Sequence, residues 1–200
     1  MKRSLGILIG MNLIGAPLIA LATPAGDQLQ EALTTKRQQK RRIVLPLPAP
    51  VTPVVSPQSF EGRLLATHNA ERKRLGIAGL AWNPQLAAQA ANWAQNLASK
   101  GIFEHSKNRG NVGENLWMGT SGYYQPEAMI GAFVGERQYF RAGKFPDVST
   151  TGNWSDVGHY TQLIWPGTKD VGCAKATGRG NDVLVCRYAP AGNVMGQQVP

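Results

Sequence analysis

The chain has 200 residues and a formal net charge of +9, with two cysteines and three histidines. This length fits one folded domain with appended segments. The positive charge favours anionic surfaces such as lipid head groups or envelope polymers, and because no nucleic-acid-binding motif is present, nucleic acid is excluded as a partner.

The first 22 residues are typical of a secretory signal peptide. Lys2 and Arg3 form a basic start, an apolar stretch from Leu5 to Ala22 follows, and Ala20-Leu21-Ala22 has the small-residue pattern of a cleavage site. A membrane anchor is the alternative, because the stretch approaches the length that spans a bilayer, but its glycines and Pro17 disfavour it. We therefore expect an exported chain, secreted or periplasmic.

Residues 23–57 are predicted to form a linker that is basic first and proline-rich afterwards. The proline-rich part, residues 45–57, should be extended, because proline fixes φ and removes a backbone donor. The basic part either docks the protein on an anionic envelope surface or is an ordinary solvated charge run. Its charged residues are Lys36, Arg37, Lys40, Arg41 and Arg42.

Three helices are predicted next. Ser59 is the N-cap of a helix that runs to about Leu75, before Gly76. A second helix has Asn83 as its N-cap and Pro84 at its first position, and it ends at Gly101. A third runs from Pro126 to about Arg141.

Three later segments read as strands, and a shorter candidate precedes them. The later segments are Tyr160–Trp165, Val171–Ala176 and Val183–Tyr188, and the shorter one is Asn115–Met118. Helices followed by strands indicate the α+β class, with helices packed on an antiparallel sheet.

Cys173 and Cys186 are expected to form a disulfide. An even number of cysteines in an exported chain favours pairing, and turn residues between the two would let a pair of strands bring them together. A reactive thiol is the alternative, but neither cysteine lies at a helix N-terminus.

Four motifs occur in order along the chain. They are His68-Asn69-x-x-Arg72, Gly113-Glu114-Asn115-Leu116, the segment Gly158–Trp165 and the segment Val183–Val194. Together they resemble the signature set of the CAP superfamily, also called the SCP domain family, which includes cysteine-rich secretory proteins, venom antigen five and plant pathogenesis-related class-one proteins. The resemblance covers about residues 58–200 and implies an α-β-α sandwich with a central antiparallel sheet. The small number of cysteines suggests a bacterial-like exported member.

The resemblance also implies a cleft lined by two histidines and two glutamates, here His105, Glu114, Glu136 and His159. Neutral imidazoles bind Zn²⁺ and other divalent metals, while carboxylates complete the shell or orient the rings. The same four residues could instead act as general acids and bases, or simply satisfy one another's hydrogen bonds. His68, with Asn69 and Arg72, is expected to be structural.

The resulting function is predicted as binding rather than turnover, and whether the chain is an enzyme stays open. The first hypothesis is a secreted module that binds a lipid, a sterol or a protein partner, with a divalent metal in the cleft. The second is a metal-dependent, protease-like hydrolase using the same cleft, and the third is an envelope-surface protein docked by its basic arm. Trp154, Tyr123 and Tyr124 lie in loops, where they either pack or contact a ligand.

Overall fold

The computed structural model describes residues 55–200. The signal peptide predicted for residues 1–22, the basic run and most of the linker predicted for residues 23–57 lie outside the described residues. The helices are α2 (Phe60–Arg74), α3 (Pro84–Lys100), α4 (Pro126–Gly135) and α5 (Gly158–Leu163), with 3₁₀ turns η1 (Glu136–Tyr139) and η2 (Trp154–Val157).

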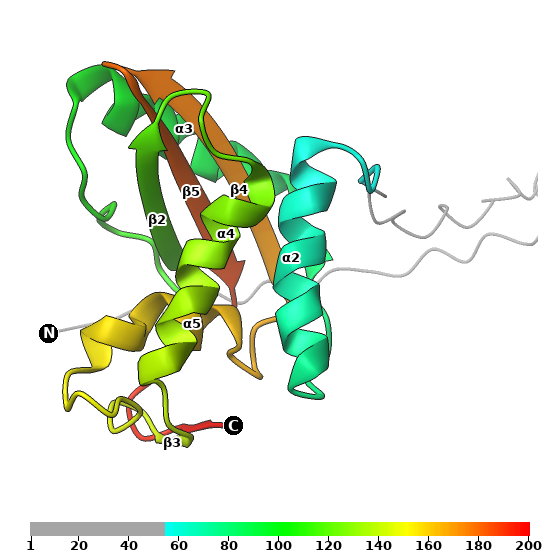
Figure 1. Cartoon of the computed structure of the whole chain (residues 1–200), viewed down its shortest axis with the longest axis vertical. Coiled ribbons are helices and arrows are strands. Elements are labelled where there is room, and N and C mark those ends of the chain that lie inside the picture. Colours follow the sequence, from blue (N-terminus) through cyan, green and yellow to red (C-terminus); the bar gives the residue numbers. More distant parts are fainter. Residues whose placement is uncertain (1–54) are drawn as a thin grey trace, which may run out of the picture. The chain divides into compact units, whose positions relative to one another are not determined.

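The strands form a sheet of four and a separate pair. The larger sheet has the order β1 (Ala81–Trp82), β4 (Asp170–Gly178), β5 (Asn181–Ala189), β2 (Gly113–Thr120), and the pair is β3 (Gly143–Lys144) with β6 (Gln198–Val199). β2, β5 and β4 are antiparallel, whereas the short β1 runs parallel to β4. Helix α3 covers one face of the sheet, and α2 and α4 lie over the other (Figure 1). The predicted α+β class and the α-β-α sandwich are confirmed.

Strand β5 is buried on both faces, because each face contributes to a different core. Val183 and Val185 pack with the small and apolar side chains of α3, such as Leu97. Leu184 and Tyr188 point the other way and pack among residues of α2, α4 and α5. This alternation follows from the period of two along a strand.

Two glycines of β4 let α3 lie unusually close to the sheet. A Cβ at Gly172 would stand 2.3 Å from the backbone nitrogen of Ala87, and one at Gly178 would stand 2.4 Å from the carbonyl oxygen of Ala98. Any side chain at either position would therefore push the helix away from the strand.

The helix starts follow the predicted caps. The Ser59 hydroxyl accepts from the N–H of Gly62, and the Asn83 side chain accepts from the N–H groups that open α3. Gly101 ends α3 with a φ of 69°, the left-handed conformation that glycine adopts without strain. The third helix is shorter than predicted, since α4 ends at Gly135 and only a 3₁₀ turn continues to Tyr139.

The prediction of a strand over Tyr160–Trp165 was wrong, because this segment begins in helix α5. All six residues are buried, so the sequence shows no alternation by which to tell a strand from a buried helix. Side chains from distant parts of the sequence bind the free backbone groups at both ends of this helical segment. A carboxylate oxygen of Glu136 accepts from the N–H groups of His159 and Tyr160 at its start, and Arg72 donates to the carbonyls of Leu163 and Trp165 at its end.

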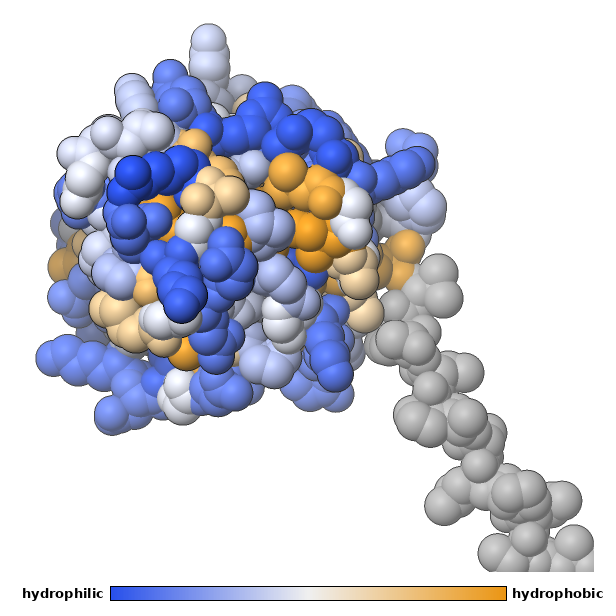
Figure 2. Space-filling model, turned by 90° about the horizontal axis from the view of Figure 1, so that it is seen from below, coloured by the Kyte–Doolittle hydropathy of each residue, from blue (hydrophilic) through white to orange (hydrophobic). Residues whose placement is uncertain are grey.

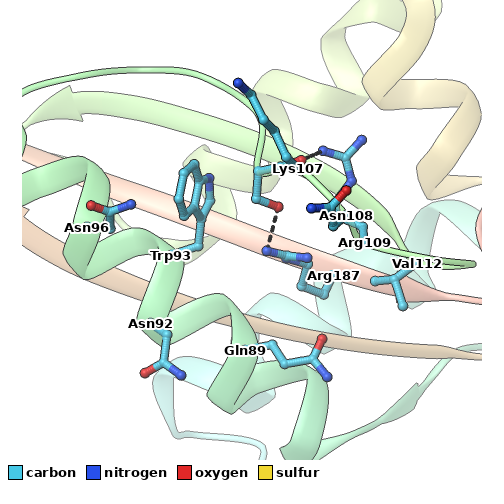
Figure 3. A pocket seen from close by; sticks show the side chains of 10 residues that line it. Gln89, Asn92, Trp93, Asn96, Lys107, Asn108, Arg109, Val112 and Arg187 are labelled. Atoms are coloured by element: carbon cyan, nitrogen blue, oxygen red, sulfur yellow. Dashed lines mark hydrogen bonds between the residues drawn. The ribbon is translucent and has the colours of Figure 1, made fainter.

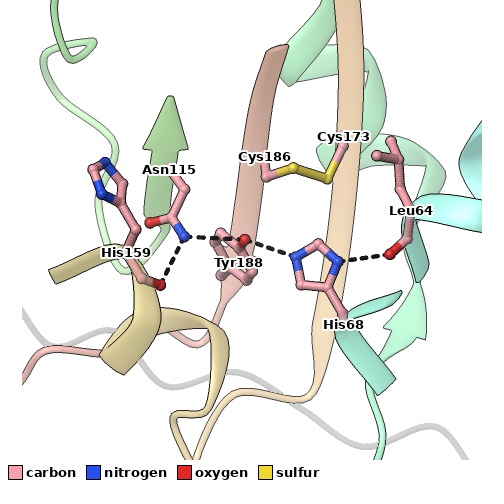
Figure 4. The surroundings of a disulfide bond; sticks show 7 residues. All are labelled: Leu64, His68, Asn115, His159, Cys173, Cys186 and Tyr188. Atoms are coloured by element: carbon pink, nitrogen blue, oxygen red, sulfur yellow. Dashed lines mark hydrogen bonds between the residues drawn. A yellow bond between two sulfur atoms is a disulfide. The ribbon is translucent and has the colours of Figure 1, made fainter. Parts of the chain in front are cut away.

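The predicted disulfide between Cys173 and Cys186 is confirmed, and both residues are buried. The two cysteines stand directly opposite each other on β4 and β5, with Cα atoms 4.1 Å apart (Figure 4). A two-residue turn joins the strands, and Arg179 and Gly180 both have positive φ, as tight hairpin turns require.

Seen from below the view of Figure 1, the surface is mainly hydrophilic, and the hydrophobic areas are small (Figure 2). Small areas of this kind are ordinary on a folded domain. Within residues 55–200, no helix has both the length and the apolar content needed to cross a membrane.

Candidate functional site

A buried chain of hydrogen bonds links the first motif to the others (Figure 4). His68 Nδ1 lies 2.8 Å from the carbonyl oxygen of Leu64, and because a carbonyl only accepts, Nδ1 carries the proton. Nε2 must then accept from the hydroxyl of Tyr188, also at 2.8 Å. The side-chain amide of Asn115 donates to that hydroxyl oxygen at 3.2 Å and to the carbonyl of His159 at 3.0 Å.

This hydrogen-bonded network keeps His68 neutral. Burial lowers the pKa of His68 to about 4. The hydrogen bond to Leu64 raises the pKa and the charge of Arg72 lowers it, but burial is the largest effect. Burial likewise raises the pKa of Tyr188 far above its ordinary value. Both nitrogens of His68 are used, so the ring ties α2 to β5 and offers no free ligand atom.

The other two residues of the first motif also bond to backbone. Arg72 is fully buried and donates to four carbonyl oxygens. These acceptors belong to Ala78, Leu163, Trp165 and Thr168. Burial lowers the pKa of this guanidinium to about 10, so it still carries its charge near neutral pH. Asn69 both donates to and accepts from the backbone of Leu80, which fixes the segment before β1.

A cleft of about 780 Å³ opens where the loop after α3, the start of β2 and the start of α5 meet. His105, Glu114 and His159 line it, together with Asn115. Glu136 does not line the cleft but holds His159 from behind. Phe145, Trp154 and Met195 form an apolar part of its wall.

Glu114 and Asn115 point to opposite faces of the sheet because side chains alternate along β2. Asn115 reaches Tyr188, as described above. Glu114 stands opposite Arg187 on the other face, where its side chain is fully buried. The G-E-N motif thus serves two networks, one in the core and one at the cleft.

His105 is held by Glu114. Its Nδ1 lies 2.7 Å from Oε1 of the carboxylate, so Nδ1 carries the proton and points Nε2 away from Glu114. Ser106 adds two bonds to the same carboxylate, from its N–H and from its hydroxyl, both at 2.9 Å. The His105 side chain itself is 52% exposed.

Two arginines also face Glu114. Nη2 of Arg187 lies 3.0 Å from Oε2, and Nη1 of Arg109 lies 3.3 Å from Oε1. Burial raises the pKa of Glu114, but hydrogen bonds from His105 and Ser106 and the charge of Arg187 outweigh burial and leave the pKa below its ordinary value. Glu114 therefore stays ionised near neutral pH and is a poor proton acceptor.

The second pair has the same arrangement. His159 Nδ1 lies 2.5 Å from Oε1 of Glu136, while Oε2 accepts the backbone N–H groups at the start of α5. The ring of Phe133 stacks on the imidazole, with centroids 5.0 Å apart and planes inclined by 16°. His159 therefore has a fixed ring whose Nδ1 is used and whose Nε2 has no hydrogen-bond partner among residues 55–200.

The donor set suits a divalent transition metal of the zinc type. Two imidazole Nε2 atoms belong to rings that line one cleft, and each ring is oriented by a carboxylate on Nδ1, as is usual for metal-bound histidine. The two carboxylates are occupied as acceptors, so they belong behind the ligands. Within the described chain, no three of the four residues bring ligand atoms within 4.8 Å of one another, so water would complete the shell.

Another group of metal-ligating residue types is not a metal site. His68, Cys173 and Cys186 have ligand atoms close together. The two sulfurs are joined in the disulfide, and both nitrogens of His68 are hydrogen-bonded. Metal binding needs a thiolate or a free imidazole nitrogen, so this group has nothing to offer.

Sequence reasoning missed the two arginines and a third acidic residue. Glu71 is buried and accepts from Arg74, Arg137 and the Tyr160 hydroxyl, which locks α2 to the segment after α4. Arg187 could have been found from the sequence, because it is a charged residue within an otherwise apolar predicted strand. A charge buried in this way needs a partner of opposite charge. Of the loop aromatics, Trp154 lines the cleft, whereas Tyr124 packs against Trp117.

Fold, motifs and cleft together define the class of protein. The chain belongs to the cysteine-rich secretory protein family, abbreviated CAP, whose pattern matches residues 65–188. It is 34% identical over 141 residues to pathogenesis-related protein 1C of Nicotiana tabacum, a match covering 70% of this chain and 80% of the tobacco protein. It is 33% identical over 144 residues to Golgi-associated plant pathogenesis-related protein 1 of Homo sapiens, covering 70% of this chain and 88% of the human protein.

A solved structure of the same fold is described as NaASP2 with Zn²⁺. It is 27% identical to this chain, with a TM-score of 0.58, and the match covers 68% of this chain and 82% of that one. The buried disulfide and the pathogenesis-related relatives agree with a protein that works outside the cytoplasm.

Proposed function

We propose that this CAP domain is an exported binding module whose cleft holds a divalent metal, Zn²⁺ foremost, through Nε2 of His105 and Nε2 of His159. The observation that carries the proposal is the matched orientation of the two rings. Each Nδ1 faces a glutamate oxygen, so the neutral ring carries its proton there and keeps the lone pair of Nε2, and both rings line one cleft. The Zn²⁺ in the related structure of NaASP2 supports the choice of metal.

The histidine inventory of the chain sharpens this proposal. The whole sequence contains three histidines and two cysteines. The cysteines form the disulfide, and His68 uses both ring nitrogens in the core. His105 and His159 are therefore the imidazoles left for a metal, and a zinc site that lacks them would depend on oxygen ligands.

The protease-like hydrolase is the second hypothesis, and in it neither carboxylate is free to act as the general base. Glu114 is fully buried under five donor groups, and Glu136 accepts three N–H bonds. A general base must reach a water or substrate proton with an unoccupied atom, so Nε2 of His105 or His159 would take this role, and a bound metal would compete for the same lone pairs.

The apolar side of the cleft suggests what else the module holds. Phe145, Trp154 and Met195 line it, and Trp154 is 42% exposed. This wall fits the apolar part of a lipid or sterol, or an apolar side chain of a partner protein. Docking through the basic run at residues 36–42 stays a prediction, since that run lies outside the described residues.

A calorimetric Zn²⁺ titration of the purified protein near neutral pH tests the metal site. We expect one binding event, which disappears in a variant carrying His105→Ala and His159→Ala. The matched control is His68→Gln, which removes the third imidazole and should leave the binding event in place. Unchanged binding in the double variant, or no binding by the parent protein, would overturn the proposal.

A further inference from the structure

A second pocket, of about 490 Å³, lies between α3 and the segment 106–112 (Figure 3). We call it the amide–arginine pocket. Its walls carry the side-chain amides of Gln89, Asn92 and Asn96, and three cations. The cations are Lys107, Arg109 and Arg187, and within residues 55–200 no carboxylate lines the pocket.

The helical wall of the pocket is polar and uncharged. Gln89, Asn92, Trp93 and Asn96 recur at the spacing of one helix face, so the three amides and the indole project to the same side of α3. The indole N–H is bonded to the carbonyl of Glu104, which fixes the ring and leaves the side-chain amides beside it (Figure 3). An indole face flanked by amide donors and acceptors suits a molecule rich in hydroxyls.

The opposite wall contains two guanidinium groups with unused donors. The Arg187 side chain is only 8% exposed, and its Nε has no hydrogen-bond partner among the described residues. The buried Nε of Arg109 is likewise without a partner. A buried donor without a partner costs stability, so both guanidinium groups are short of acceptors. A ligand in the pocket would meet them through Nη1 of Arg187 and Nη2 of Arg109, since the hydrogen bonds of these arginines to other described residues use the other Nη atom.

The charge balance indicates that the acceptor is anionic. Among the described residues, the one carboxylate that contacts these two arginines is Glu114, and a single guanidinium would be enough to neutralise it. Burial lowers the pKa of Arg187, and the charge of Glu114 only partly offsets it. A bound oxyanion would meet the excess positive charge and the unused donors together, as guanidinium groups do for phosphate or carboxylate.

We propose that the amide–arginine pocket binds an anionic saccharide, with its oxyanion on Arg187 and Arg109 and its hydroxyls on the amides of α3. This pocket adjoins the histidine cleft, because Ser106, Lys107, Asn108, Arg109 and Val112 line both. The Ser106 hydroxyl accepts from Arg187 while donating to Glu114. Arg187 and the amides of α3 line this pocket and not the cleft, so variants at these positions test the pocket separately.

The test uses the purified protein in excess chelator, so that the histidine cleft holds no metal. Glucose 6-phosphate, inorganic phosphate and glucose are titrated in turn by calorimetry. Glucose 6-phosphate should bind more tightly than phosphate, and glucose should show no binding, because the oxyanion supplies the charge and the hydroxyls supply the remaining contacts. Phosphate binding as tightly as the sugar phosphate would mean an adventitious anion site and would overturn the proposal.

Variants assign the two walls. Arg187→Lys keeps the charge but removes Nε and the planar fork, and it should weaken binding of both anions about tenfold. Asn92→Ala with Asn96→Ala changes one exposed and one half-buried side chain of α3, and it should weaken binding of the sugar phosphate without affecting that of phosphate. Lys144→Ala removes an exposed positive charge on β3 and should change neither affinity.

Thermal unfolding of each variant checks that the fold is retained. Should Arg187→Lys fail to fold, the asparagine pair decides the proposal by itself. Equal affinity of that pair and the parent protein for glucose 6-phosphate would overturn it.

Discussion

Buried His68 and half-buried His159 lie at two ends of one hydrogen-bonded chain, yet only His159 keeps a free ring nitrogen. Both rings carry their proton on Nδ1, which donates to a carbonyl in His68 and to a carboxylate in His159. The difference is at Nε2, which accepts from the Tyr188 hydroxyl in His68 and faces the cleft in His159. One histidine therefore holds the fold together, while the other is available for a ligand.

This comparison shows that partners, rather than residue type, decide the role of a histidine. The core network around His68 is complete, with each donor matched to an acceptor, as a buried polar network must be. In the cleft, by contrast, each histidine is held by a glutamate at Nδ1, and its Nε2 has no hydrogen-bond partner among the described residues. Damage to the core network should therefore cost stability, and damage to the cleft should cost binding.

The largest effect on stability is expected for Arg72→Met. Methionine fills similar volume but leaves the four buried carbonyl oxygens that Arg72 serves without donors. The free energy of unfolding, measured with urea, should fall by on the order of 4 kcal/mol. Lys73→Met, at the neighbouring exposed position, is the control and should change it by less than about 0.5 kcal/mol. Similar losses in both variants would contradict the structural role of Arg72.

The protonation of His68 should appear as a loss of stability in mild acid. Its pKa is about 4 in the folded protein, against an ordinary value of 6.5. Between these values the unfolded chain binds a proton that the folded chain does not, so unfolding becomes easier as the pH falls. The contribution reaches about 3 kcal/mol and is absent above pH 6.5.

The comparison of the protein with His68→Gln isolates this contribution. Urea unfolding is measured at several pH values between 6.5 and 4.5. Glu114, whose ordinary pKa is 4.5, begins to take up protons in the unfolded chain towards the lower end of this interval, but it does so equally in the parent protein and in the variant. The parent protein should lose stability over this interval more steeply than the variant. Parallel curves would show that His68 is protonated in the folded state or is not buried.

A smaller effect is expected when a glutamate behind the cleft loses its charge. Glu136→Gln keeps an oxygen near Nδ1 of His159 but removes the negative charge that faces this ring and helps to hold it in place. Zinc affinity should fall about 10- to 100-fold, measured by competition with a chromogenic chelator. Glu127→Gln removes an exposed carboxylate from α4 and serves as the control. Equal affinities in the two variants would remove Glu136 from the metal site.

The smallest effect on stability is expected for the cleft histidines. His105 is half exposed, and His159 is 35% exposed, so His105→Ala with His159→Ala should reduce the free energy of unfolding by only about 1 kcal/mol. The measurement is urea unfolding in chelator, where no metal contributes. A loss as large as that of Arg72→Met would show that the two His–Glu pairs serve the fold rather than a ligand.

Much of this architecture was predictable because it is specified locally. The caps at Ser59 and Asn83 and the end at Gly101 follow from side chains within a few residues of each helix terminus. The disulfide followed from export and pairing. The segment Tyr160–Trp165 was not predictable, because its helix depends on Glu136 and Arg72, which come from other parts of the chain.

Only the residues of the site that belong to the family motifs could be predicted from the sequence. The resemblance supplied His105, Glu114, Glu136 and His159, and the structure pairs each histidine with one glutamate. It gave no hint that Glu114 also binds Arg109 and Arg187, since those contacts depend on strand register and on the path of a loop. Side chains that meet across such distances leave no pattern in one sequence.

The most direct test of the division between core and cleft is nitrogen-15 NMR of the histidine rings. The protein has three histidines, so the ring signals can be assigned with single variants. All three rings should carry the proton on Nδ1, and added Zn²⁺ should shift Nε2 of His105 and His159 while leaving His68 unchanged. A zinc-induced shift of His68, or Nε2–H forms of the two cleft rings, would contradict the account.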